Sequence, residues 1–361
     1  MIQNTNVALE IENLPTPALL VELDKFEANI SRMASETAAA GKKLRPHAKA
    51  HKCVEIAKRQ IAAGAVGVCV ATAAEATMVA RGGIDDLLLT SPLADPLKMA
   101  GVVQTGAMVV VDNLRQVRWY QEAACAANVQ LAVLVDLDPG DHRTGAATLE
   151  QAVEIALAID QASHLWLRGV QAYSVAGSHG KDADERLAYS QTTFSFALEV
   201  VAACARHGLH SDVVSGGSTG TWDVDQSIAG VNEIQAGSYA LMDMAYRRIG
   251  VDFEPAMSVL ATVISANHSD FVTVDAGFKA FSTDRAFGPE PVSLQGAAYR
   301  WGGDEFGYLD LFDCKTKPKL GDKIQFWPPH CDPTVNLYAK IHAYRGRVVE
   351  DVWSVMGRSI A

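Results

Sequence analysis

The stretch Leu44-Arg45-Pro46-His47-Ala48-Lys49-Ala50-His51-Lys52-Cys53 decides how the chain is interpreted, because it places three cations and two histidines between two helical patterns. Pro46 disfavours helical backbone at Arg45, so we expect an extended strand end here. Side chains alternate along a strand, which puts His47, Lys49 and His51 on one face. A half-buried ammonium group is costly unless it has a chemical role.

Lys49 has two interpretations. It is either part of a solvated basic strand end, or a lysine that forms a Schiff base with an aldehyde. The second role requires an amine that is partly deprotonated, which burial and neighbouring cations achieve. The pattern alone leaves both open.

Three motifs resemble the D-threonine aldolase and D-serine dehydratase-like family of pyridoxal-phosphate enzymes. They are RPHAKAHKC at 45–53, TPALLVELDKFEANI at 16–30 and PPHCDPTVNLY at 328–338. The resemblance extends over about residues 16–358 and implies a fold-type III enzyme with an alanine racemase-like N-terminal barrel. It also implies that Lys49 binds pyridoxal 5'-phosphate as a Schiff base and that His47 lies beside the cofactor.

Composition excludes several classes of partner. The chain has 361 residues and a formal net charge of -11, so it carries no basic surface suited to nucleic acid or an anionic membrane. The six cysteines form no CxxC pair, and there is no apolar run long enough to span a bilayer and no cationic leader. We expect a cytoplasmic protein that acts on a small molecule. A homodimer stays open.

Short apolar runs alternate with amphipathic helical patterns through most of the chain, which predicts parallel βαβ units. The expected strands are 18–23, 44–47, 66–71, 86–90, 108–112, 131–136, 165–173 and 212–215. Eight such units favour a closed barrel, although an open doubly wound sheet has the same alternation. The family resemblance selects a (β/α)8 TIM-type barrel, and we assign residues 14–248 to it as the pyridoxal-phosphate domain.

The pattern changes after the barrel. Short segments rich in β-branched residues and separated by Gly, Pro and Asp predict a smaller, mostly antiparallel β domain. We assign residues 249–361 to this domain, with the option that 1–13 join it. It carries the PPHCDPTVNLY motif.

Two glycine-rich segments are candidates for phosphate binding. Backbone N–H groups and hydroxyls in such turns bind anions, although glycine-rich turns are common and this signal is weak by itself. The segment 214–221 resembles the family's phosphate loop, and 235–239 resembles its QAGSY motif. The resemblance therefore implies that the phosphate is held by Ser218, Thr219, Gly220, Gly237, Ser238 and Tyr239.

Three further residues follow predicted strands, where barrel enzymes keep their reactive groups. The resemblance places Arg143 opposite the pyridine nitrogen, Tyr173 of the QAY motif near the cofactor, and His179 as the base for the substrate hydroxyl. The loop around Arg143 is longer than the family pattern. Without the resemblance, these residues are a surface arginine, a core aromatic and a solvated histidine.

His330 and Asp332 are the candidate metal ligands. Two residues apart on an extended segment, they share a face, so an imidazole and a carboxylate can bind one ion. Dehydratases of the family carry His-x-Cys here and aldolases His-x-Asp. The resemblance therefore favours an aldolase with Mn²⁺ or Mg²⁺. Phe306 stands where the family usually has a histidine.

These features imply a lyase that cleaves D-3-hydroxy amino acids such as D-threonine to glycine and an aldehyde. The catalytic residues would be Lys49 and His179. The alternative is a D-serine or D-3-hydroxyaspartate dehydratase on the same scaffold. A non-catalytic pyridoxal-phosphate carrier and a metal-independent racemase fit less well, because both leave the His-x-Asp pair without a role.

Overall fold

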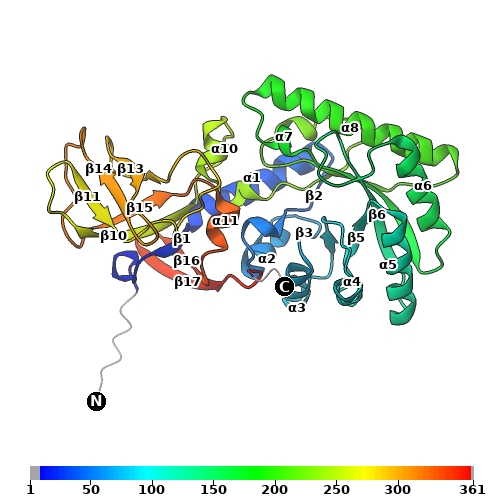
Figure 1. Ribbon diagram of the computed structural model, residues 1–361, viewed down its shortest axis with the longest axis horizontal. Helices are drawn as coiled ribbons and strands as arrows, with labels where there is room; N and C mark the ends of the chain where they lie inside the picture. The colour runs from blue at the N-terminus through cyan, green and yellow to red at the C-terminus, as the bar shows by residue number, and fades with distance from the viewer. Residues whose placement is uncertain (1–8, 359–361) are drawn as a thin grey trace, which may run out of the picture.

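The computed structural model describes residues 9–358. An eight-stranded parallel sheet and a nine-stranded, mostly antiparallel sheet form the two ends of an elongated molecule, and α1 (Leu23–Ala39) runs between them (Figure 1). This confirms the predicted fold class. None of the helices in the described range is both long and apolar enough to cross a lipid bilayer.

The parallel sheet has one strand from each βα unit. Its order in space is β2 (Lys43–Leu44), β9 (Glu233–Ile234), β8 (Val213–Gly216), β7 (Leu165–Ala172), β6 (Leu131–Leu137), β5 (Met108–Val111), β4 (Leu87–Leu89) and β3 (Val68–Val70). An isolated parallel bridge between His47 and Cys69 joins the two ends of this order, which closes the barrel.

The barrel interior is apolar. A separate cluster takes one buried residue from each of five strands: Cys69, Leu88, Val110, Leu134 and Val213. Neighbouring strand residues belong instead to the large core under the helices, as expected when side chains alternate across a parallel sheet that is buried on both faces.

Helices cover the outside of the barrel. The long ones are α2 (Val54–Ala62), α3 (Ala73–Arg81), α4 (Pro96–Val103), α5 (Leu114–Ala127), α6 (Leu149–Asp160) and α8 (Ala183–Arg206), and the short ones are α7 (Val175–Ser178) and α9 (Trp222–Asp225). The short helix α10 (Met244–Arg248) lies instead next to the second sheet, where the Met244 N–H donates to the Pro328 carbonyl oxygen at 3.1 Å (Figure 1). Side-chain caps at Thr72, Asp95, Asn113, Thr148 and Asp182 accept backbone N–H groups and fix where five of the helices begin.

The second sheet is built mainly from the C-terminal part of the chain. Its strands are β10 (Met257–Ser265), β11 (Phe271–Val274), β12 (Glu290–Pro291), β13 (Ala298–Trp301), β14 (Gly307–Asp310), β15 (Lys323–Trp327), β16 (Lys340–Arg345) and β17 (Val348–Ser354), together with β1 (Ala18–Glu22). The helix α11 (Cys331–Val335) follows β15 and faces the barrel (Figure 1).

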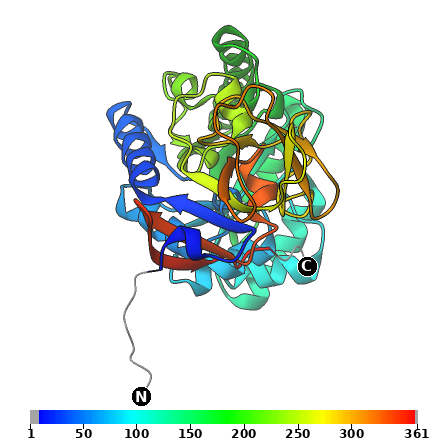
Figure 2. The same ribbon diagram turned by 90° about the vertical axis from the view of Figure 1, so that its left-hand side faces the viewer.

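The first predicted barrel strand was placed in the wrong sheet. β1 pairs antiparallel with β10 and parallel with β16, so it lies inside the second sheet, beside strands from the other end of the chain (Figure 2). The eighth barrel strand is instead β9, which the sequence analysis did not predict as a strand. Both errors arise because an apolar run does not specify the sheet in which it pairs.

The predicted domain boundary at 248/249 stays a prediction. The N-terminal limit of the barrel domain, predicted at residue 14, changes. Ile11–Asn13 forms the 3₁₀ helix η1, and Glu10 bridges Val348 of β17, so residues 10–22 accompany the second sheet. Residues 1–8 and 359–361, which were part of the same assignment, lie outside the described residues.

Candidate active site

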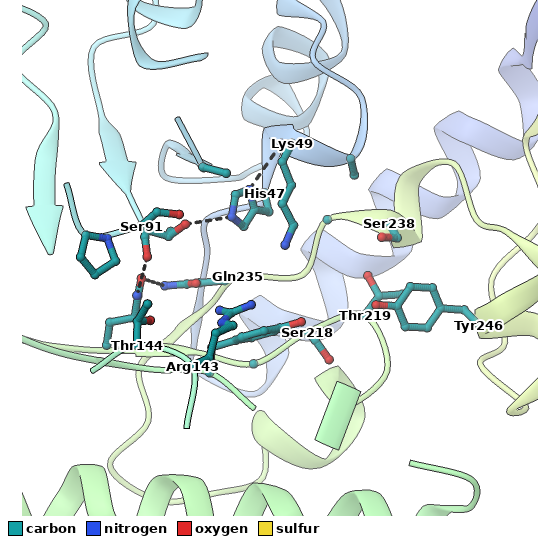
Figure 3. A pocket seen from close by; sticks show the side chains of 18 residues that line it. His47, Lys49, Ser91, Arg143, Thr144, Ser218, Thr219, Gln235, Ser238 and Tyr246 are labelled. Atoms are coloured by element: carbon teal, nitrogen blue, oxygen red, sulfur yellow. Dashed lines mark hydrogen bonds between the residues drawn. The ribbon is translucent and has the colours of Figure 1, made fainter. Parts of the chain in front are cut away.

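A cavity of about 400 Å³ opens at the carboxyl ends of the barrel strands (Figure 3). Strand ends and the loops after them converge there, as in other βα barrels. Eight of the predicted site residues line it: His47, Lys49, Arg143, Tyr173, Ser218, Thr219, Gly237 and Ser238.

Lys49 enters this cavity from a 3₁₀ turn and not from a strand. β2 ends at Leu44, and the turn η2 (Ala48–Ala50) follows, with the Lys49 N–H donated to Nδ1 of His47 at 3.4 Å. Each residue of such a turn rotates the side chain by a third of a circle. His51 is therefore directed elsewhere, and its Nε2 lies 3.2 Å from Oε1 of Gln60. The prediction of one shared strand face was wrong.

His47 is held in a neutral form. Its Nε2 lies 3.0 Å from the Thr90 hydroxyl, which itself donates to the carbonyl oxygen of Val70. Burial and then the charge of Lys49 hold the pKa of His47 well below its ordinary value. The imidazole thus accepts from Lys49 N–H and donates to Thr90, which fixes the backbone of Lys49.

Two cations face the cavity without a counterion. The Lys49 Nζ lies 5.6 Å and the Arg143 guanidinium carbon 5.0 Å from the centre of the Tyr173 ring. Neither side chain has a hydrogen-bond or ion-pair partner among residues 9–358, and both point into the cavity in Figure 3. Unpaired cations in a half-enclosed cavity favour an anionic ligand.

The loop that carries Arg143 is rigidly folded despite its added length. Asp138 accepts the N–H groups of Gly140 and His142, and a bridge between Leu137 and Ala146 closes the loop. A Cβ on Gly145 would lie 2.3 Å from the Asp138 nitrogen, so only glycine fits there. The loop therefore presents Arg143 to the cavity.

One wall of the cavity offers free hydrogen-bond donors. The backbone N–H groups of Thr219, Gly237 and Ser238 donate to no acceptor among the described residues, and the Ser218 and Ser238 hydroxyls lie beside them. A Cβ on Gly237 would lie 2.7 Å from the carbonyl oxygen of His47, so the backbone approaches closely there. Such a set of N–H and O–H groups suits a phosphate.

Two predicted phosphate residues do not line the cavity. The Tyr239 side chain is fully buried, and its hydroxyl accepts from Nε2 of Gln60 at 3.1 Å. The Gly220 N–H donates to the Ser218 hydroxyl at 3.2 Å, so this residue shapes the loop from behind. Both motifs lie beside the cavity, as expected, but Gly220 and Tyr239 support its wall from behind and do not line it.

His330 and Asp332 lie next to the cavity, at the start of α11. Nε2 of His330 is 3.8 Å from Oδ2 of Asp332, and Oδ2 accepts the Ser238 hydroxyl at 3.3 Å. Burial opposes ionisation of Asp332, but Lys49 and then His330 hold its pKa below the ordinary value. Ser238 thus connects this pair to the cavity that contains Lys49.

The sequence analysis missed two residues beside this pair, Asp284 and Arg285. Nδ1 of His330 lies 2.7 Å from Oδ2 of Asp284, which leaves Nε2 directed towards Asp332. Nη2 of Arg285 lies 3.1 Å from Nε2 of His179. They occur in an ordinary loop sequence, and no spacing pattern indicates them.

His179 lies outside the cavity lining but is stacked on Tyr246, which does line it, with ring centres 5.0 Å apart. Burial, then Arg285 and His330, lower the pKa of His179 to about 4. The imidazole is therefore neutral near pH 7, and its Nε2 accepts an N–H of Arg285 at 3.1 Å.

Two glutamines complete the floor of the cavity. Gln235 donates to Oε1 of Gln171 at 3.1 Å, and Gln171 donates to Asp136 at 2.8 Å. Both begin motifs that the sequence analysis quoted, QAY and QAGSY. The first residue of each motif is thus a site residue that the motifs already contain, beside the predicted tyrosines, glycine and serine.

Comparison with known families decides where the chain belongs. The family model described as "Alanine racemase, N-terminal domain" matches residues 21–245, more than half of the chain. The chain belongs to the D-threonine aldolase and D-serine dehydratase-like family of pyridoxal-phosphate enzymes. A second model, "Putative serine dehydratase domain", matches residues 256–344.

Relatives in this family are similar over nearly their whole length. A 3-hydroxy-D-aspartate aldolase of Paracoccus denitrificans is 35% identical, with 97% of this chain and 94% of the relative covered. A D-threonine aldolase of an Arthrobacter species is 34% identical with the same coverage. The crystal structure of a D-threonine aldolase from Filomicrobium marinum superposes with a TM-score of 0.95 at 35% identity and covers 98% of each chain. The predicted family and its carbon–carbon lyase class are confirmed.

The residues present fit the cofactor of the family. Within residues 9–358, Lys49 and Arg143 form no ion pair, and they share one cavity with a wall of unused backbone N–H groups. They also fit a divalent cation, since His330 and Asp332 offer one nitrogen and one oxygen ligand. Among residues 9–358, no group of three or more His, Cys, Asp or Glu side chains is arranged so that all of them could hold one metal ion.

Proposed function

We propose that this protein is a pyridoxal-phosphate- and divalent-metal-dependent aldolase that cleaves D-3-hydroxy amino acids to glycine and an aldehyde. One observation carries the proposal: Ser238 lines the cavity of the unpaired Lys49 and is also hydrogen-bonded to Asp332 of the His330/Asp332 pair. An amine for the cofactor and a pair for the substrate hydroxyl then lie side by side.

The chain holds the cofactor through three groups. Lys49 would supply the amine for its aldehyde, Arg143 would lie beside the ring, and the wall at 217–219 and 237–238, which lines the same cavity, would hold the phosphate. Bound there, pyridoxal phosphate supplies an acceptor for the electrons released at Cα. A permanent cation at Arg143 disfavours protonation of a ring nitrogen and moderates that acceptor.

His330 and Asp332 would hold a divalent cation, which would supply a site for the β-hydroxyl of the substrate. His179 would accept the proton of that hydroxyl. Asp284 supports this by fixing the imidazole of His330, and the neutral state of His179 leaves it able to act as a base. Nitrogen and carboxylate ligands suit Mn²⁺ or Mg²⁺. A reducing compartment such as the cytoplasm belongs to the proposal, since all six cysteines are free and four are buried.

Dehydration is the second candidate, because the model of the serine dehydratase domain matches residues 256–344, which contain the proposed metal pair. Dehydration would remove the α-proton and expel the β-hydroxyl instead of breaking Cα–Cβ. Asp332 favours the aldolase, since a carboxylate is a harder ligand than the thiolate of the family's dehydratases.

The test is a product assay on the purified holoenzyme with D-threonine and L-threonine. We expect glycine and acetaldehyde from the D-isomer only, activity lost after EDTA and restored by Mn²⁺, and no activity in Lys49→Ala. Ammonia and 2-oxobutanoate would identify a dehydratase. Full activity after exhaustive chelation would refute the metal dependence.

A further inference from the structure

Arg285 has hydrogen-bonding capacity that the protein leaves unused. Its Nε is buried without a hydrogen-bond partner, and the side chain is only 23% exposed. The nearest carboxylate oxygen, Oδ2 of Asp284, lies 3.6 Å away, beyond hydrogen-bond distance. A buried donor without a partner costs free energy. Nε itself is closed to solvent, so an acceptor from outside the chain would reach the guanidinium from the exposed part of the side chain.

The groups around Arg285 do not neutralise it fully. Asp284 directs the same Oδ2 to Nδ1 of His330 at 2.7 Å. The other neighbours of the guanidinium are imidazoles, with Nη2 at 3.1 Å from Nε2 of His179 and at 3.5 Å from Nδ1 of His330. An anion that binds here would contact the Arg285 cation, and the neighbouring Asp284 carboxylate is already hydrogen-bonded to His330.

The position of Arg285 corresponds to one part of the substrate. In the function proposed above, on which this inference rests, His330 and Asp332 hold the hydroxyl on Cβ. The first atom of any other substituent on Cβ is two bonds from that oxygen, and the Arg285 guanidinium lies 3.5 Å from Nδ1 of His330. A planar guanidinium binds a carboxylate through paired N–H groups and offers nothing specific to a methyl group.

We propose that Arg285 is the residue that selects the Cβ substituent, and that it selects a carboxylate. The preferred substrates are then β-hydroxy D-amino dicarboxylic acids, of which 3-hydroxy-D-aspartate is the smallest. The Cα–Cβ bond breaks, the hydroxyl proton leaves to His179, and Cα gains a proton. Glycine and glyoxylate are the products, and no other reactant is needed.

The same contact connects substrate binding to the base. Arg285 donates an N–H to Nε2 of His179, so that lone pair is occupied in the free enzyme. A carboxylate on Cβ competes for the guanidinium and frees Nε2 to accept the hydroxyl proton. A substrate with a methyl group at this position leaves the contact in place. Such a substrate therefore binds more weakly, and it is also cleaved more slowly at saturating concentration.

The experiment compares two D-amino acids that cannot be cleaved because they lack the β-hydroxyl. D-Aspartate and D-2-aminobutyrate differ only in having a carboxylate or a methyl group on Cβ. Both are titrated into the holoenzyme, with the change in cofactor absorbance as the readout. We expect D-aspartate to bind about 10- to 100-fold more tightly, as for a charge-assisted hydrogen bond, and Arg285→Gln to abolish the difference.

Two variants separate charge from position. Arg285→Lys keeps the cation and should restore part of the preference, whereas Arg300→Gln, which removes an exposed arginine paired with Asp310 in the same sheet domain, should leave it unchanged. For cleavage, the ratio of kcat/KM for 3-hydroxy-D-aspartate to that for D-threonine should fall about 10- to 100-fold in Arg285→Gln.

Other outcomes would overturn the assignment. Equal weakening of both ligands in Arg285→Gln would mean that Arg285 binds the α-carboxylate, and no preference in the wild type would mean that it does not bind a carboxylate on Cβ. In both cases the cofactor band persists and the proposed aldolase stands. A wild type that forms no cofactor band would overturn the function and the assignment together.

Discussion

At the scale of single residues, the site depends on residues that a neighbouring side chain holds in place. His47 fixes the backbone of Lys49, and Asp284 fixes the imidazole of His330. Each supporting contact sets which imidazole nitrogen carries the proton and therefore which nitrogen is free. Supporting residues of this kind are open to test separately from the residues that they position.

Asp284→Asn tests the support of His330. Asparagine retains the shape but loses the charge that orients the imidazole, so we expect Mn²⁺ affinity to fall about 10- to 100-fold with cofactor binding unchanged. Isothermal titration calorimetry with Mn²⁺ measures this. Asp313→Asn, an exposed carboxylate of the same domain, is the matched control. Unchanged affinity in Asp284→Asn would contradict the role.

At the scale of elements, the turn after β8 and the turn after β9 form the donor wall together. Thr219 accepts the Tyr239 N–H at 3.0 Å, so the two turns are joined directly. Asp225 of α9 supports the first turn from behind by accepting the Thr221 hydroxyl, and Thr221 accepts the Ser218 N–H at 3.2 Å. The donor wall is therefore sensitive to added side-chain volume at Gly237 and to the charge of Asp225 beneath it.

Gly237→Ala tests the volume. The new Cβ would lie 2.7 Å from the His47 carbonyl oxygen and 3.0 Å from its Cβ, so the segment before Lys49 must shift. We expect a loss of stability of about 1–3 kcal/mol and weaker cofactor binding. Thermal unfolding and titration with pyridoxal phosphate measure the two effects.

Gly101→Ala is the control for Gly237→Ala. It lies in α4 with nothing within 4 Å of the added Cβ, and it should stabilise the protein by about 0.5–1 kcal/mol because glycine is a poor helix former. Equal effects of both substitutions would show that the close approach at Gly237 has no importance.

Asp225 makes stability depend on pH. Burial raises its pKa from 3.8 to about 7, so between these values the folded state binds a proton that the unfolded state has lost. This group's contribution to stability is therefore complete below pH 4 and falls as pH rises to about 7, by up to about 1.4 kcal/mol per pH unit. Asp225→Asn should remove that fall.

Urea unfolding of wild type and Asp225→Asn from pH 4 to pH 8 measures the difference. The two should be similar at pH 4, with the variant the more stable at pH 8. Asp223→Asn, an exposed neighbour in α9, should follow the wild type. Parallel curves for wild type and Asp225→Asn would show that the buried carboxyl does not titrate in this range.

At the scale of the whole molecule, β1 connects the two halves. It lies between β10 and β16, and α1 continues directly from it towards the barrel. Leu19 and Val21 belong to the large core shared with the barrel, whereas Leu20 belongs to a small cluster on the other face. The second sheet is therefore incomplete without the N-terminal segment.

A chain of residues 249–358 alone should fail to fold, because β10 and β16 lose the strand between them. Residues 9–22 joined to residue 255 by a short glycine linker should fold, since Glu22 N–H already donates to the Ala256 carbonyl oxygen at 2.8 Å. Circular dichroism and cooperative urea unfolding of the two chains measure this. Cooperative unfolding of the shorter chain would disprove the requirement for β1.

The amino-acid sequence alone predicts the βα alternation, the change to an antiparallel β pattern in the C-terminal part of the chain and the motifs around Lys49, Ser218 and His330, because these patterns depend on neighbours within a few residues. Only the tertiary structure placed β1 in the second sheet, turned η2 so that Lys49 and His51 diverge, and brought Asp284 and Arg285 to His330. Those arrangements depend on which distant segments pack together. That choice is made by burial and strand pairing over the whole chain, and no local pattern records it.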